Sequence, residues 1–133
     1  MINNNKIMQE ELIDFNTAVL AKEKGFDYKT FYCYLEDSAI QFSSGEDGDN
    51  DEYNHNEWDN YSAPTQGLLQ KWLRELPTPI IITPITDFIT WEVQIQHADK
   101  DLITLSKNND NEWFISYEEA LEAGLFKALK LIK

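Results

Sequence analysis

The sequence has few of the residues that build covalent or metal-bound scaffolds. Its 133 residues include one cysteine, Cys33, and two histidines. A lone cysteine cannot form an internal disulfide, and zinc sites usually draw on several cysteines and closely spaced histidines. A chain of this length buries roughly two-thirds of the surface that its unfolded form exposes. We therefore expect it to fold on an apolar core, without disulfides or structural metal.

Basic residues are also scarce. The chain has 11 Lys and Arg against 24 Asp and Glu, which gives a formal net charge of −13. A surface this acidic repels the phosphates of nucleic acids and of anionic membranes. The five glycines are not arranged as a phosphate-binding loop. We therefore expect neither direct nucleic-acid binding nor membrane association.

No hydrophobic run is long enough to cross a bilayer. The longest apolar-rich stretch, residues 80–95, is interrupted by Pro84, Asp87 and Glu92, and a membrane span needs about 20 apolar residues. The N-terminus lacks the pattern of a signal peptide. Together with the single cysteine, these features predict a cytoplasmic location in the cell that makes the protein.

Apolar residues are plentiful, at 42% of the chain with 13% aromatic, which favours a packed chain over a disordered one. Apolar residues repeat at three- and four-residue steps in three segments, as in amphipathic helices, and alternate or cluster in five others, as in strands. The expected helices are residues 5–24, 62–76 and 116–132, and the expected strands are residues 30–35, 39–42, 80–83, 91–95 and 102–105.

These segments predict a single α+β domain over residues 1–133. The expected architecture is a small, mainly antiparallel sheet of three to five strands covered by three helices, in the order α-β-β-loop-α-β-β-α. A weak final strand could form near residues 113–115. Ser62 and Ser116 have the type and position of helix N-caps, and Glu119 completes the spacing of a capping box with Ser116.

An acidic loop at residues 43–60 interrupts this pattern, with many carboxylates and no Lys or Arg. Alternating carboxylates in a loop can bind calcium. However, Glu52 stands where the calcium loop needs glycine, and Trp58 stands where it needs a bidentate Glu. A solvated loop is therefore favoured over a calcium site, whose candidate ligands are Asp47, Asp49 and Asp51.

Candidates for catalysis or for a transition metal are weak. Cys33 could pair with His55 or His97 as nucleophile and base, and His55 lies among acidic residues that could contribute metal ligands. Cys33 sits in an aromatic strand pattern, where cysteine usually behaves as a small buried apolar residue. We therefore expect no catalytic residue and no cofactor.

A binding face is conceivable around Lys71, Trp72 and Arg74, since Trp and Arg are common interface residues. Trp72 also belongs to an apolar stripe with four leucines, which is typical of a core-facing helix. The core interpretation of Trp72 is favoured, and the three residues stay as binding candidates.

Three runs of sequence carry a resemblance: DFNTAVLAKEKGF at residues 14–26, APTQGLLQKWLREL at 63–76 and SYEEALEAGLFKALKLI at 116–132. In this order they resemble a family of small phage and prophage proteins carried by mobile elements of Bacteroidetes-type bacteria. The resemblance implies a phage or mobile-element origin, and so places the expected cytoplasmic location in a bacterial host. It supplies no activity and no site residues.

Three functions stay open on this basis. The favoured one is a non-catalytic binding protein whose partner is a host or phage protein. The second is an acidic nucleic-acid mimic that inhibits a host DNA-binding protein. The third is a small-ligand or nucleotide-binding protein, or an enzyme, with a dispersed site. Exposed apolar patches would favour the first function, and carboxylates clustered on one face would favour the second.

Overall fold

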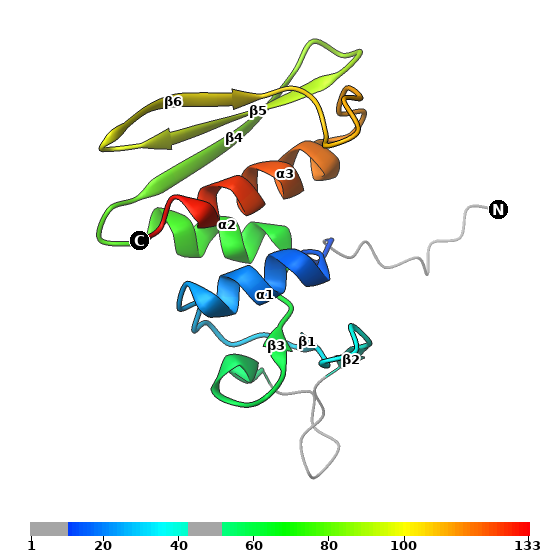
Figure 1. Cartoon of the computed structure of the whole chain (residues 1–133), viewed down its shortest axis with the longest axis vertical. Helices are drawn as coiled ribbons and strands as arrows, with labels where there is room; N and C mark the ends of the chain where they lie inside the picture. The colour runs from blue at the N-terminus through cyan, green and yellow to red at the C-terminus, as the bar shows by residue number, and fades with distance from the viewer. Residues whose placement is uncertain (1–10, 43–51) are drawn as a thin grey trace, which may run out of the picture.

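Three helices lie between two separate antiparallel sheets in the described part of the computed structural model (Figure 1). The structure describes residues 11–42 and 52–133. The α+β class predicted from the sequence is confirmed. The elements are α1 (Phe15–Glu23), β1 (Tyr32–Tyr34), β2 (Ile40–Phe42), the 3-10 helix η1 (His55–Glu57), β3 (Tyr61–Ser62), α2 (Gln66–Arg74), β4 (Ile80–Thr86), β5 (Trp91–His97), β6 (Lys100–Leu105) and α3 (Tyr117–Lys130).

The larger sheet has the order β4-β5-β6 and packs on α3. One row of its inner face runs through Ile82, Ile95 and Ile103, which are paired across the three strands. Residues alternate between buried and more exposed positions along β5, because successive side chains of a strand point to opposite faces. Pro84 lies in the edge strand β4, where a residue without an N–H is tolerated.

Helix α3 approaches this sheet very closely at Gly124. A Cβ atom placed on Gly124 would lie 2.6 Å from Cγ2 of Val93 and 3.1 Å from Cγ2 of Ile82. The helix can therefore pass this close only because the residue has no side chain. Ser116 caps the helix as predicted, since its hydroxyl accepts a hydrogen bond from the backbone N–H of Glu119.

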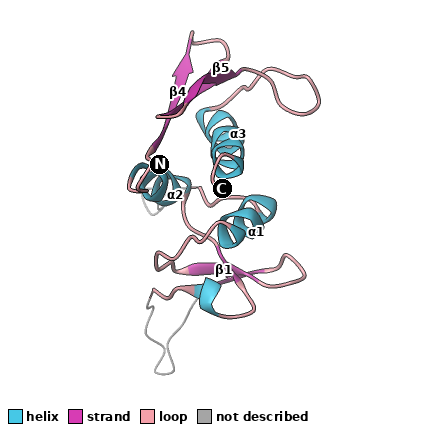
Figure 2. Cartoon of the chain, turned by 60° about the vertical axis from the view of Figure 1, so that its left-hand side comes forward, coloured by secondary structure: helices cyan, strands magenta, loops and turns pink. Residues whose placement is uncertain are grey.

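The smaller sheet, β2-β1-β3, lies on the opposite side of the helices (Figure 2). Its Tyr34 and Tyr61 are cross-strand partners, and both pack edge-on against Phe15 of α1. The sequence predicted one sheet, but the strands form two. The unforeseen strand β3 pairs with β1 and places the N-terminal hairpin on α1, away from the larger sheet.

Two predicted helix starts are displaced. Helix α1 begins only at Phe15, after the extended N-cap Asp14, and Leu12 forms a β-bridge with Thr65. Ser62 belongs to β3, and the N-cap of α2 is Thr65, whose hydroxyl accepts a hydrogen bond from Leu68 N–H. Residues 5–10 of the first predicted helix lie outside the described residues.

The described part of the acidic loop, residues 52–60, packs on the rest of the chain. The Asn56 side chain donates to the carbonyl of Phe26 and accepts from Ser62 N–H. The Lys22 ammonium donates to the carbonyls of Trp58 and Asn60. Within the described ranges, no helix is both long and apolar enough to span a membrane.

Candidate functional site

The most exposed large apolar side chains lie at the turn between β4 and β5. Phe88 is 95% exposed and Ile89 is 83% exposed. Single exposed apolar residues are common on protein surfaces, but adjacent ones that form a patch often mark an interaction site. We call Phe88 and Ile89, together with the neighbouring Ile115 and Tyr117, the tip surface.

Hydrogen bonds within the turn fix the backbone that carries Phe88 and Ile89. The Asp87 carboxylate accepts from the N–H groups of Ile89 and Thr90, both at 2.9 Å. The Thr86 hydroxyl accepts from Phe88 N–H and donates to the carbonyl of Thr90. The Asp87 N–H donates to the same carbonyl. Every backbone N–H from residue 87 to 90 is therefore satisfied inside the turn, and the turn does not need its two apolar side chains.

Phe88 has an unfavourable backbone conformation. Its φ is +75°, in the left-handed region where a residue with a Cβ costs roughly 1–2 kcal/mol. Local outliers of this kind often occur at functional sites. In this turn the conformation accompanies a phenyl ring that lies almost entirely in solvent.

The segment before α3 extends this surface beside the turn, where β5 begins at Trp91. Trp91 N–H donates to the carbonyl of Phe114, and the two residues form an isolated β-bridge. A second bridge joins Lys107 to Trp113, so the weak strand expected at residues 113–115 is present only as isolated bridges. Ile115 follows Phe114 and is 77% exposed, and Tyr117 packs edge-on against Trp91, with ring centroids 5.5 Å apart.

The hairpin carries negative charge only. The sequence has no Lys or Arg between Arg74 and Lys100, whereas Asp87 and Glu92 lie within the hairpin. Hydrogen bonds from the N–H groups of Thr90 and Ile89 lower the pKa of Asp87. The carboxylate beside Phe88 is therefore ionised at neutral pH.

The three binding candidates predicted on α2 lie in different environments, one in the core and two on the surface. Trp72 is 6% exposed and packs edge-on against Phe26 in the core, in line with the core interpretation. Lys71 and Arg74 are exposed and line a groove of about 480 Å³. Phe31 and Tyr32 line the same groove; the sequence pattern assigned both to a strand and gave no signal of this proximity.

The metal and nucleophile candidates gain no support. Asp47, Asp49 and Asp51 lie outside the described residues. Within the described part of the chain, no group of three His, Cys, Asp or Glu residues is placed to hold a metal ion. Burial raises the pKa of the Cys33 thiol, which disfavours the reactive thiolate. Burial also lowers the pKa of His55.

A half-buried carboxylate on α3, missed by the sequence analysis, links the three helices. The Glu122 side chain accepts hydrogen bonds from the Thr17 hydroxyl at 2.5 Å and from the N–H of Asp14 at 2.9 Å, both on the N-terminal side of α1. It also accepts from the Gln66 amide of α2 at 3.0 Å. Burial raises the pKa of Glu122, while the bonds from Thr17 and Gln66 oppose that shift. Because these hydrogen bonds occupy both of its carboxylate oxygens, Glu122 has a structural role.

Comparison of the chain with protein-family models, curated proteins and solved structures found no match.

Proposed function

We propose that the protein is a non-catalytic binding protein that contacts another protein through the tip surface. The observation that carries this proposal is the ordered β4–β5 turn, which holds Phe88 and Ile89 in solvent. Protein interfaces typically depend on a few apolar or aromatic side chains that enter a pocket of the partner. A turn already fixed by its own hydrogen bonds loses little conformational entropy on binding, which favours affinity.

The charges around the tip surface indicate the chemistry of the partner. Asp87 and Glu92 give the hairpin its negative charge and Glu118 follows Tyr117, while one lysine, Lys107, lies in the bridge to Trp113. A complementary partner offers an apolar pocket with basic residues at its rim. Attraction between opposite charges would speed association and make it sensitive to salt. The resemblance to phage and prophage proteins supports a host or phage protein as this partner.

The alternative of a nucleic-acid mimic receives less support. Carboxylates, among them Glu11 and Asp14, line a groove of about 700 Å³ beside α3. Lys107, Lys127 and Lys130 line the same groove. A replica of a phosphate backbone needs a continuous negative surface, so this mixture of charges favours the protein-binding proposal.

The test is affinity capture from a lysate of a Bacteroidetes-type host, with the wild-type protein and two variants. In the first variant, Phe88 and Ile89 are both replaced by Ser. The second carries Trp58→Ser, which removes a large side chain that is 69% exposed outside the tip surface. We expect a partner that is retained by the wild type and by the Trp58 variant, and lost by the tip variant. An unchanged set of captured proteins with the tip variant would refute the proposal.

A further inference from the structure

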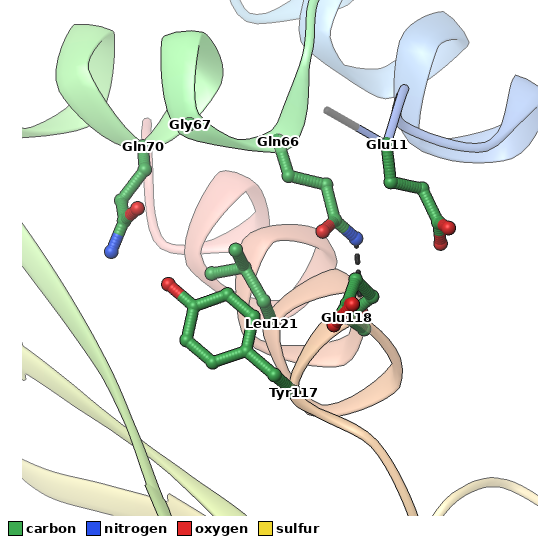
Figure 3. A pocket seen from close by; sticks show the side chains of 7 residues that line it. All are labelled: Glu11, Gln66, Gly67, Gln70, Tyr117, Glu118 and Leu121. Atoms are coloured by element: carbon green, nitrogen blue, oxygen red, sulfur yellow. Dashed lines mark hydrogen bonds between the residues drawn. The ribbon is translucent and has the colours of Figure 1, made fainter. Parts of the chain in front are cut away.

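A small pocket lies between the first turns of α2 and α3, next to the tip surface. Its volume is about 280 Å³, and Tyr117 belongs both to its lining and to the tip surface. Gln66, Gln70 and Glu118 contribute polar groups, Glu11 stands at the edge, and the apolar contact comes from Leu121 (Figure 3). The pocket has room for one side-chain-sized group.

The orientation of two amide groups determines what this pocket can bind. The Gln66 Nε2 group donates to the Glu118 carbonyl at 2.9 Å and to the Glu122 carboxylate at 3.0 Å, which uses both of its hydrogens. Gln66 is only 4% exposed, so its side chain is held in this position. Because the nitrogen faces the two acceptors, the amide oxygen must face the other way. Figure 3 shows this oxygen turned toward the pocket.

Gln70 repeats this arrangement from the next turn of α2. Its Nε2 group donates to the carbonyl of Ile82 in β4 at 2.8 Å, and its oxygen is turned toward the pocket (Figure 3). The Tyr117 hydroxyl points toward Gln70 in the same view. The pocket therefore offers two fixed carbonyl oxygens, a hydroxyl oxygen and the carboxylate of Glu118, while the carboxylate of Glu11 points away from it at the edge (Figure 3). Its polar groups are mainly hydrogen-bond acceptors.

We propose that this pocket binds the guanidinium group of an arginine side chain of the protein that contacts the tip surface. A guanidinium is planar, always charged and has five N–H donors with no acceptor, which matches several acceptors around one small volume. Its flat apolar faces suit contact with Tyr117 and Leu121. The inference rests on the proposed binding function for the source of the arginine, and it agrees with a partner whose apolar pocket has a basic rim.

The pocket can be tested on the isolated protein by an NMR titration with N-acetyl-arginine methylamide. The control ligand is N-acetyl-citrulline methylamide, which has nearly the same shape as the arginine compound but no charge. The lysine analogue keeps the charge and tests whether binding requires the planar guanidinium group. We expect saturable shifts of the side-chain amide signals of Gln66 and Gln70 with the arginine compound. Charged hydrogen bonds are about twice as strong as neutral ones, so the citrulline compound should bind about tenfold more weakly, and the lysine compound should also be weaker. Equal binding of the three compounds, or no shift at these signals, would overturn the inference.

Two variants and one control assign the effect to the pocket. Glu118→Gln should weaken binding of the arginine compound about fivefold or more, and Tyr117→Phe should weaken it to a smaller extent. The control, Glu119→Gln, makes the same change in charge in the same helix turn, but Glu119 does not line the pocket. This variant should therefore bind the arginine compound with the affinity of the wild type. If Glu119→Gln weakens binding as much as Glu118→Gln, the effect is general electrostatics and the pocket assignment is wrong.

The tip variant separates this inference from the proposed function. Replacing Phe88 and Ile89 by Ser should abolish capture of the partner and leave binding of the arginine compound unchanged. If the tip variant loses the partner while the arginine compound fails to bind even the wild-type protein, only the guanidinium inference is refuted. If the arginine compound binds but the tip variant still captures the partner, the proposed function is refuted.

Discussion

The contact between Gly124 and the larger sheet gives a stringent test of the packing. In Gly124→Ala, the new methyl group would lie 2.6 Å from Cγ2 of Val93 and 3.1 Å from Cγ2 of Ile82. Carbon atoms in ordinary contact are about 3.5–4.0 Å apart, so the helix or the strand would have to move by about 1 Å. Val93 and Ile82 are β-branched and have few alternative rotamers. Overpacking of this kind costs about 1–3 kcal/mol.

Alanine also stabilises a helix by about 1 kcal/mol relative to glycine, which acts in the opposite direction. With an overpacking cost of about 2–3 kcal/mol and a helix gain of about 1 kcal/mol, we expect Gly124→Ala to lower the free energy of unfolding by about 1–2 kcal/mol. For a chain of this size, each kcal/mol corresponds to a fall in Tm of about 4 °C. Urea denaturation followed by tryptophan fluorescence measures the effect. Gly67→Ala is a matched control at an exposed position in α2, and it should be neutral or stabilising.

A double-mutant cycle with Val93→Ala identifies the cause. Removing the two Val93 methyl groups creates space for the methyl group introduced at position 124, so the double variant should be more stable than the sum of the single effects predicts. The expected coupling is about 1–2 kcal/mol. If Gly124→Ala is as stable as the wild type or more stable, or if the two changes are additive, the proposed close approach of α3 to β5 is wrong.

Three further changes test other parts of the structure. Trp72→Ala should lower the free energy of unfolding by about 3–5 kcal/mol, as expected for a large core aromatic; a variant that melts like the wild type would contradict the core position. Phe88→Gly should leave Tm unchanged or raise it by a few degrees, because glycine removes the cost of a positive φ, whereas a large fall in Tm would show that the phenyl ring supports the fold. Burial lowers the pKa of His55, so its stabilising contribution is fully present above its ordinary pKa of about 6.5 and is lost as the pH falls through the lower pKa of the folded state. The stability of the wild type relative to His55→Gln should therefore decrease from pH 7 to pH 5, and a constant difference would contradict this.

The sequence predicted best the elements whose signals are local. Ser116 has the residue type of an N-cap and is followed by a long apolar repeat, so the start of α3 was predicted correctly. The alternation from Trp91 onward predicted β5 for the same reason, since one face of this strand is buried against α3. Short-range periodicity is sufficient when an element packs with a single buried face.

The features that the sequence did not predict depend on contacts between distant segments. Strand β3 has only two residues, Tyr61 and Ser62, too few for any periodic signal, and its pairing with β1 creates the second sheet. The cluster around Glu122 joins residues more than 100 positions apart. The tip surface had a detectable signal, because Phe88 and Ile89 follow Asp87 in a polar turn between two strands, but their exposure became evident only in the structure.

The central claim is that Phe88 enters a partner protein, and site-specific photocrosslinking tests it most directly. Phe88 is replaced by the photoreactive residue p-benzoylphenylalanine, and the protein is irradiated in a host lysate. The same replacement at Trp58, which is also largely exposed but outside the tip surface, is the control. We expect position 88 to form a discrete crosslinked product with one protein, and position 58 not to form it. The absence of a discrete product at position 88, or the same product at both positions, would contradict the claim.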